Sequence, residues 1–462
     1  MKQFLPAILI LCCITSTAQT FEGTWQGRLQ FWTQDFRLVF RISKNTDGKF
    51  AGTVQSPDQD PKLFEMDEVD VTGDSITMEM TEFEATFTGT FNRDSNAIFG
   101  KMEQKGFKLP MKLLKGEAED LLYNRPQKPK PPFPYLEEEV KIFNKQDGDT
   151  LAGTLTKPSG KGKFPAVILI TGSGPENRDE TVFGHKPFLL IADYLTRKGY
   201  AVLRCDDRGI GFSTGNFKAA TTADFARDAE AQLAFLRKRK DIDVKQIGLL
   251  GHSEGGVIAP MIAAKDKKIG FVILLAAPAI DMFDLLLAQD SLSSKAEGSS
   301  RKDIDELIET NTKLFGILKQ SKDSLDAQRG IVDYLAANNT SGKEIEMAIK
   351  QLCSPWMRWY IGYRPQANIE KMTCPVLAMN GAKDVQVPPS INIPVIDSLL
   401  RKGGNQHFET RILPGCNHLF QHCKKGAVSE YISIDQTMDP AALEMIAAWM
   451  EKNVPTGRVT GQ

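Results

Sequence analysis

Short, continuous apolar runs alternate with helical stretches along the chain from about residue 137 onward. The runs read PAVILIT, YAVLRCD, QIGLLGH, GFVILLAAP, PVLAMNG and FETRILPG, and the segment PAALEMIAAWMEK closes the series. A strand that is apolar on both faces must be covered on both, and such strands alternate with crossover helices in parallel sheets. We therefore predict an α/β domain, with a mostly parallel sheet flanked by helices.

One block interrupts this alternation. Residues 279–365 contain no comparable apolar run, and their apolar spacing is helical. They divide the α/β core into residues 137–278 and 366–458. An insertion at this point is expected over the carboxyl ends of the strands, where a lid would lie. We predict a helical cap, with a purely structural insertion as the alternative.

The region before residue 137 has a different pattern. Residues 19–118 consist of short segments with period-two alternation, separated by Asp, Asn, Gly and Ser. This pattern is typical of a small antiparallel barrel or sandwich. Five prolines follow between Pro126 and Pro134, and we interpret residues 119–136 as a stiff proline-rich linker.

The first 18 residues predict a targeting segment. Lys2 precedes the apolar run FLPAILILCCI, and Ser16 and Ala18 are small residues placed for cleavage after Ala18. We expect a signal peptide, a secreted or periplasmic protein, and no stable membrane span after cleavage. The alternatives are a short membrane anchor and, more weakly, a lipoprotein modified at Cys12.

Composition narrows the classes of partner. A length of 462 residues indicates two or more domains, and a net charge of -1 gives no field for nucleic acid. We expect no nucleic-acid partner, and an oligomer of identical chains stays open. The cysteines that follow the signal peptide are few and odd in number, which argues against a disulfide framework. Whether Cys416 and Cys423 form a bridge stays undecided.

The stretch GLLGHSEGG, residues 248–256, carries the chemistry. It leads from an apolar run into a small-residue helix, with Ser253 between Gly251 and Gly255. A tight strand-to-helix turn crowds the positions two before and two after its apex, where glycine fits. We predict a nucleophile elbow that exposes Ser253, and an ordinary turn is the alternative.

A nucleophilic serine needs a base and an acid that orients the base. His418 lies in a loop after FETRILP and is the best base, ahead of His422 and His185. Asp384 follows the run PVLAMNG and is the best acid. Asp281, after the preceding run, is the alternative acid.

The negative oxygen of an acyl-transfer intermediate needs two N–H donors. We assign the backbone N–H of Glu254, at the start of the helix, and that of Ser173, in the loop ITGSGPENRD. The chain order Ser253, Asp384, His418 is the order expected for an α/β-hydrolase sheet.

Five segments together resemble the α/β-hydrolase superfamily: GSGPENRDE, DDRGIGFSTG, GHSEGG, NGAKDVQVP and GCNH. They are most similar to bacterial carboxylesterases and to dienelactone-hydrolase-like or serine-aminopeptidase-like members, some of which carry an extra N-terminal β-domain and a helical cap. The resemblance covers about residues 137–278 and 366–455. It implies these roles: Ser253 as nucleophile, Asp384 as acid, His418 as base, and Ser173 and Glu254 as oxyanion donors.

The aromatic stretch SPWMRWYIGYRP adds candidate pocket residues. Trp356, Trp359 and Tyr360 could form the wall of an acyl pocket, or could pack the cap against the core.

A zinc site is a weaker interpretation of one cluster near the C-terminus, whose members are Cys416, His418, His422 and Cys423. Their spacing matches no established zinc motif. We expect no metal and no cofactor.

The sequence as a whole predicts a secreted serine hydrolase that cleaves carboxylic esters, with short acyl chains, through an acyl-enzyme. A serine aminopeptidase or other peptidase with the same three residues is the alternative, and a binding protein with an inactive hydrolase fold is a third.

Overall fold

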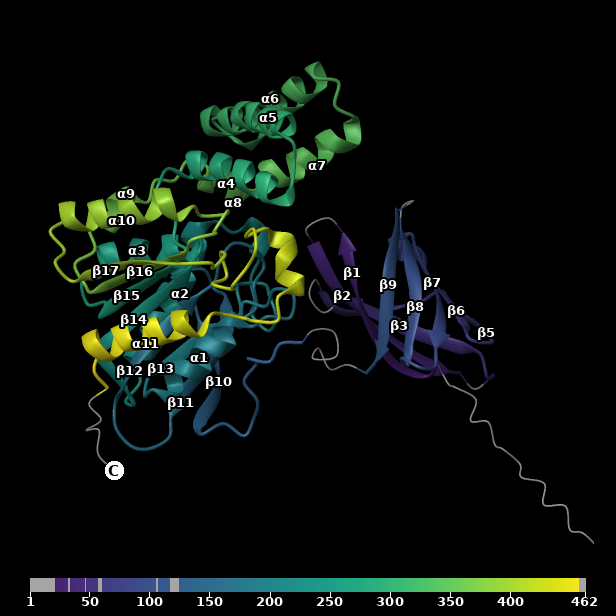
Figure 1. Cartoon of the computed structure of the whole chain (residues 1–462), viewed down its shortest axis with the longest axis horizontal. Coiled ribbons are helices and arrows are strands. Elements are labelled where there is room, and N and C mark those ends of the chain that lie inside the picture. Colours follow the sequence, from purple (N-terminus) through teal and green to yellow (C-terminus); the bar gives the residue numbers. More distant parts are fainter. Residues whose placement is uncertain are drawn as a thin grey trace, which may run out of the picture. The chain divides into compact units, whose positions relative to one another are not determined.

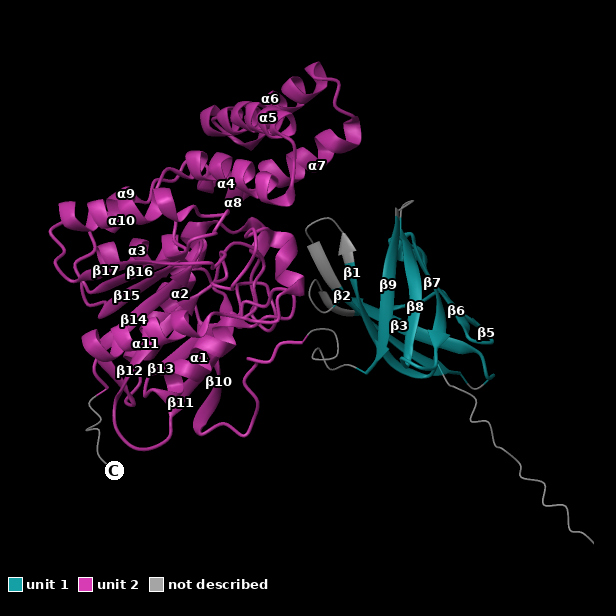
Figure 2. Ribbon diagram, in the orientation of Figure 1, with its two compact units in different colours: residues 1–122 teal, residues 123–462 magenta. Residues whose placement is uncertain are grey.

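The computed structural model describes residues 21–31, 34–45, 47–56, 60–104, 107–116 and 124–456. The chain divides into two compact units, residues 1–122 and 123–462 (Figure 2). The signal peptide that we predict over residues 1–18 lies outside the described residues. Among the described helices, none has both the length and the apolar character that crossing a bilayer requires.

The N-terminal unit is an antiparallel meander. Its sheet has the order β4-β3-β2-β1-β9-β8-β7-β6-β5, and every described neighbouring pair is antiparallel. Trp25, Phe40 and Phe87 are fully buried in its core. The strands are β1 (Gly23–Phe31), β2 (Gln34–Lys44), β3 (Phe50–Ser56), β4 (Asp60–Glu65), β5 (Glu68–Thr72), β6 (Ser75–Met80), β7 (Ala85–Asn92), β8 (Ala97–Gln104) and β9 (Phe107–Lys115).

The described part of the proline-rich segment packs on the second unit, to which it belongs. Arg125 is buried, and its guanidinium donates to the carbonyl oxygens of Phe183 at 2.7 Å and Ile434 at 2.9 Å. Gln127 donates to the carbonyl of Met438 at 2.7 Å. From Asn124 onward the segment is therefore anchored rather than a free spacer.

The second unit is built on a mixed sheet with the order β10-β11-β13-β12-β14-β15-β16-β17 (Figure 1). The pairs β10–β11 and β11–β13 are antiparallel, and all later pairs are parallel. The bounds are β10 (Tyr135–Phe143), β11 (Thr150–Pro158), β12 (Phe164–Ile170), β13 (Ala201–Cys205), β14 (Ile242–His252), β15 (Phe271–Leu275), β16 (Val376–Gly381) and β17 (Phe408–Leu413).

Helices cover both faces of this sheet, as continuous apolar strands require. One face packs against α1 (Pro187–Arg197) and α11 (Pro440–Asn453). The other packs against α2 (Thr222–Arg237), α3 (Gly255–Lys265), α9 (Gln366–Glu370) and α10 (Pro389–Lys402). This confirms the predicted fold class, an α/β-hydrolase sheet with an N-terminal all-β domain.

The predicted helical insertion lies between β15 and β16 (Figure 1). Ser or Asp precedes four of its helices, and each side chain accepts a backbone N–H of the first turn. Its own small core includes Phe315, Ile331 and Met357. The helices are α4 (Met282–Glu297), α5 (Arg301–Gln320), α6 (Ser324–Ala337), α7 (Gly342–Leu352) and α8 (Pro355–Tyr360).

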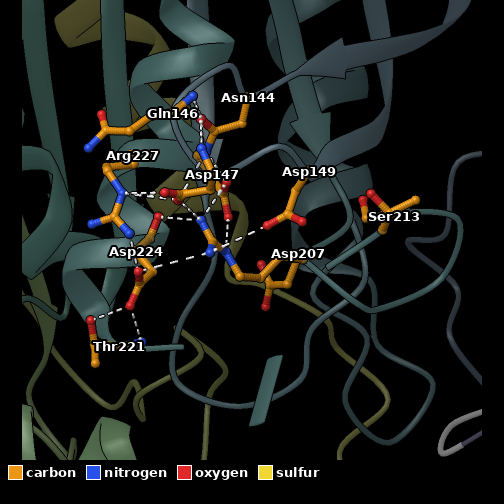
Figure 3. Close-up of polar contacts among 12 residues, drawn as sticks. Asn144, Gln146, Asp147, Asp149, Asp207, Ser213, Thr221, Asp224 and Arg227 are labelled. Atoms are coloured by element: carbon orange, nitrogen blue, oxygen red, sulfur yellow. Dashed lines mark hydrogen bonds and ion pairs between the residues drawn. The ribbon is translucent and has the colours of Figure 1, made fainter. Parts of the chain in front are cut away.

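Ion pairs fix the loop that follows β13, in what we call the Arg208 network (Figure 3). Arg208 lies 2.7 Å from both Asp228 and Asp147, and Asp147 also binds Arg227 at 2.9 Å. Arg227 in turn contacts Asp224 on the same helix, α2. The network therefore joins the β10–β11 turn, the loop after β13 and α2.

Candidate active site

Ser253 lies at the apex of the turn between β14 and α3. Its φ is +52°, a left-handed conformation that is uncommon for a residue with a side chain. A Cβ at Gly251 would lie 2.0 Å from the carbonyl oxygen of Gly255, and a Cβ at Gly255 would lie 2.1 Å from that of Ile170. Only glycine fits at these two positions, which explains the Gly-x-Ser-x-Gly spacing.

The turn lies at the point where the order of the sheet reverses. β12 pairs with β13 on one side and with β14 on the other. The chain leaves β12 in one direction and returns on the other side of it, which opens a crevice at the carboxyl ends of the strands. The loop after β12 carries Ser173, and Ser253 follows β14, so both lie at this edge.

Asp384 and His418 form a buried pair. Nδ1 of His418 lies 2.8 Å from Oδ2 of Asp384, and the other Asp384 oxygen accepts the backbone N–H groups of Gln386 and Val387, each at 2.8 Å. Both residues are 4% exposed. An ionised carboxylate held in this way keeps the proton of the imidazole on Nδ1 and leaves Nε2 as the basic nitrogen.

The alternative acid is engaged elsewhere. Asp281 binds Gln366 at 3.0 Å and Arg364 at 2.9 Å. Among the described residues, the structure therefore pairs His418 with Asp384 and not with Asp281. The hydroxyl of Ser253 makes no hydrogen bond to His418 in the described part of the chain. Such contacts are often long in a site without substrate.

The other candidate bases have their own partners. Nε2 of His422 lies 2.6 Å from Asp439. His185 is fully buried between the hydroxyl of Thr437 at 3.0 Å and the carbonyl of Tyr431 at 3.1 Å. Burial and the nearby Arg125 charge lower the pKa of His185 to about 4.

The two backbone N–H groups assigned to oxyanion binding are available. Neither the N–H of Ser173 nor that of Glu254 has an acceptor among the described residues. Glu254 immediately precedes α3, so its N–H also lies at the positive end of the helix dipole.

The side chain of Glu254 joins the helical insertion to this edge of the sheet. It is 1% exposed and accepts hydrogen bonds from Thr222 at 2.5 Å and from the indole N–H of Trp356 at 2.8 Å. Burial raises the pKa of its carboxyl group. Trp356 stacks on Tyr360, which is buried, whereas Trp359 stacks on Tyr363. Of the three predicted pocket residues, Trp356 therefore reaches the residue next to Ser253.

A cavity of about 30 Å³ lies behind the loop after β12. Its lining includes Thr171, Gly172, Asp207 and Glu254. Burial raises the pKa of Asp207 well above its usual range. The cavity has room for about one or two water molecules, so it is too small to hold an acyl chain.

Sequence reasoning missed a second buried histidine–carboxylate pair beside Ser253. The sequence pattern gives no role to His252, the residue before the nucleophile. Its Nδ1 lies 2.9 Å from Oε1 of Glu180, and its Nε2 lies 3.1 Å from the carbonyl oxygen of His418. A carboxylate in the same loop as Ser173 was the available signal. We call Glu180, His252, Ser253, Asp384 and His418 the catalytic edge.

The cysteine–histidine cluster near the C-terminus contains other residues than the weaker zinc interpretation named. Among the described residues, ligand atoms of Cys416, His422 and Asp439 lie within 4.8 Å of one another. His418 is paired with Asp384 instead. Cys416 and Cys423 are free thiols in this structure. The cluster is satisfied as an ion pair, in which Asp439 also caps α11.

Comparison with known proteins places this geometry in a family. The family model of X-Pro dipeptidyl-peptidases (S15 family) matches residues 147–394, more than half of the chain. The chain belongs to the S15 family. The predicted resemblance to the α/β-hydrolase superfamily is thereby confirmed, and S15 membership makes the protein a hydrolase of that fold.

Two curated relatives and one solved structure complete the comparison of this S15 chain. Esterase EstD of Thermotoga maritima is 28% identical over 305 residues, which are 65% of this chain and 66% of that protein, just under two thirds of its length. An uncharacterised 31.7 kDa protein of Escherichia coli is 25% identical over 54% of this chain and 83% of its own length. The solved structure of a Pyrococcus furiosus esterase has 14% identity and a TM-score of 0.43, and covers 69% of this chain and 91% of that one.

Proposed function

We propose that this S15-family chain is a carboxylesterase whose nucleophile is Ser253, with Asp384 and His418 as acid and base. The buried Asp384–His418 pair, at the same strand ends as a serine held at positive φ, carries the proposal. A structural turn has no need of a strained serine, and a buried histidine with no catalytic role has no need of a carboxylate held by two backbone N–H groups.

The proposed reaction follows from these positions. Ser253 attacks the ester carbonyl while Nε2 of His418 takes the hydroxyl proton. Asp384 stabilises the imidazolium that forms, and the N–H groups of Ser173 and Glu254 bind the negative oxygen. His418 then returns the proton to the leaving alcohol. Water, activated by His418, hydrolyses the acyl-enzyme.

The substrate class is the finer part of the proposal. The similarity to a protein named an esterase supports an ester of a small molecule. We also propose short acyl chains, and the p-nitrophenyl ester series described below tests this preference. Following the sequence pattern of residues 1–18, we also propose that the protein is secreted or periplasmic.

The family name favours a second candidate, a peptidase that releases X-Pro dipeptides. Such an enzyme must bind the substrate's α-ammonium group with an ionised, accessible carboxylate. Glu254 is the nearest carboxylate to Ser253 in sequence, but it is buried, bound by Trp356 and Thr222, and raised in pKa. It is therefore poorly suited to bind an ammonium group, and the ester substrate is favoured.

The test is a substrate panel on the purified full chain. p-Nitrophenyl esters from acetate to palmitate are compared with X-Pro and aminoacyl p-nitroanilides, with Ser253→Ala and the exposed Ser433→Ala as matched variants. We expect rapid cleavage of short esters by the native protein and by Ser433→Ala, and none by Ser253→Ala. Faster cleavage of X-Pro anilides would select the peptidase, and an active Ser253→Ala protein would refute the nucleophile.

A further inference from the structure

The Glu180–His252 pair has no role in the reaction described above, although one of its members is the residue directly before the nucleophile in the chain. His252 immediately precedes Ser253 and is 6% exposed, and Glu180 is 5% exposed. Two ionisable groups that are both buried are costly unless each is paired, and polar groups in that position usually have a specific task.

One carboxylate oxygen of Glu180 serves two segments. Oε1 accepts the backbone N–H of Gly172 at 2.8 Å and lies 2.9 Å from Nδ1 of His252. Gly172 is the residue before Ser173, whose N–H we assign to oxyanion binding. Glu180 therefore fixes the start of the oxyanion loop relative to the end of β14.

The other ring nitrogen of His252 contacts a third segment of the site, the loop that carries His418. Nε2 lies 3.1 Å from the carbonyl oxygen of His418, and the two rings are 4.7 Å apart between centroids. A carbonyl oxygen only accepts hydrogen bonds, so Nε2 must carry a proton. When the ring is protonated, Nδ1 donates to the carboxylate of Glu180.

The environment favours protonation of His252. Burial alone lowers the pKa of this imidazole, but the charge and hydrogen bond of Glu180, the carbonyl of His418 and the charge of Asp384 together raise it above its ordinary value. The donor role of Nε2 follows from its contact with the His418 carbonyl, and the raised pKa agrees with it.

We propose that Glu180 and His252 form a positioning pair, which locks the oxyanion loop, the nucleophile turn and the backbone of the catalytic histidine into one rigid arrangement. Its chain of contacts runs from Gly172 N–H through Glu180 and His252 to the carbonyl of His418. Neither residue touches substrate, and the pair acts on the geometry of the groups that do. The proposal rests on the proposed function of the same site.

Loss of the positioning pair is expected to slow the chemical step and not to weaken substrate binding. A misplacement of about 1 Å in a reacting group can cost on the order of 100-fold in rate. Loss of the pair loosens three segments whose groups act together on the transition state. We therefore expect kcat to fall, while KM, which is set by the rest of the pocket, changes little.

The experiment measures kcat per titrated serine in Glu180→Gln, His252→Asn and the double variant. A fluorophosphonate probe, reacted to completion, counts the functional sites, so a partly misfolded preparation does not lower the value. Glu180→Gln preserves side-chain volume, and its amide cannot be an ionised partner for His252. The matched control is His422→Asn, which removes another histidine–carboxylate pair from the same loop region.

We expect kcat per titrated serine to fall about 10- to 100-fold in each single variant, with KM within about threefold. The double variant should be no slower than the slower single one, because the two residues act as a unit. His422→Asn should stay within twofold of the native value.

Two results would overturn the positioning role: native kcat per titrated serine in both single variants, or multiplicative losses in the double variant. Native protein that neither cleaves esters nor reacts with the probe would instead remove the proposed function. The two failures are therefore distinguishable.

Discussion

The catalytic edge and the Arg208 network both contain buried or half-buried carboxylates but give them different partners. In the Arg208 network, Asp147 and Asp224 face guanidinium groups, which keep their charge at every physiological pH (Figure 3). At the catalytic edge, Asp384 and Glu180 face imidazoles, which gain and lose protons near neutrality. In the proposed function Asp384 stabilises the imidazolium of His418, whereas the carboxylates of the Arg208 network hold segments of the fold together.

The largest effect should come from removing the charge of the catalytic acid. In Asp384→Asn we expect kcat to fall about 10³- to 10⁴-fold, because the amide no longer keeps the proton of His418 on Nδ1. The midpoint of thermal unfolding should change far less. Ester hydrolysis per titrated serine measures the loss.

Asp281→Asn is the control for this substitution, since Asp281 was the other candidate acid and binds Gln366 and Arg364 instead. It should retain activity within a few-fold. An inactive Asp281→Asn beside an active Asp384→Asn would reverse the assignment of the acid.

The opposite pattern is expected from the Arg208 network. Arg208→Met leaves the buried carboxylate of Asp228 without its cation, and breaking a buried ion pair in this way costs about 3–5 kcal/mol. Urea unfolding should detect this loss, while kcat per titrated serine stays within about twofold.

Arg301→Met provides the matched control, because Arg301 forms an exposed pair with Asp305 on α5. Its unfolding midpoint should be unchanged. If Arg208→Met instead lost turnover at native stability, the Arg208 network would belong to the active site.

Acid should destabilise the Arg208 network in a defined pH window. Burial alone raises the pKa of Asp147 and Asp224, but their arginine and threonine partners lower both below the ordinary value of 3.8. The unfolded chain therefore takes up these protons first, so the stabilisation is complete above about pH 3.8. It is lost as pH falls through the lower pKa values of the folded state.

Urea midpoints of the native protein and of Arg208→Met, measured from pH 6 to pH 2.5, test this window. Below pH 4, the urea midpoint of the native protein should fall more steeply with pH than that of the variant. Above pH 5, the two midpoints should change in parallel. Parallel curves over the whole range would show that the Arg208 network does not depend on these charges.

The smallest effect is expected where the helical insertion meets the catalytic edge. Trp356→Phe removes one donor to Glu254 but leaves the donor from Thr222. Because Thr222 keeps this acceptor paired, only the net contribution of one hydrogen bond is lost, which is about 0.5–1.5 kcal/mol. We therefore expect kcat/KM to fall less than about 10-fold.

Trp359→Phe is the comparison for this prediction, since Trp359 stacks on Tyr363 and does not bind Glu254. Equal losses in both variants would mean that Trp356 acts by packing alone, and not through its hydrogen bond to Glu254.

The sequence pattern was sufficient to predict the main strands and helices and the fold class. Continuous apolar runs identified the strands β12 to β16 because a buried strand needs no polar face, and Gly251 and Gly255 indicated the elbow because no larger residue fits there. The separate all-β region was equally visible from its period-two alternation. These features are local, so a single sequence contains them in full.

The partnerships at the site were decided only by the tertiary structure. Both Asp384 and Asp281 follow strands that precede His418, and the sequence left them as alternatives. The arrangement of the strand ends brings Asp384, and not Asp281, to the imidazole.

The Glu180–His252 contact could not be predicted from the sequence, for the same physical reason. It joins residues 72 positions apart, and it exists because β12 and β14 are neighbours in the sheet although β13 separates them in the chain. Hydrophobic periodicity reports which residues are buried, because burial depends on local pattern. Which buried groups meet depends on the order of the strands, and only the folded sheet sets that order.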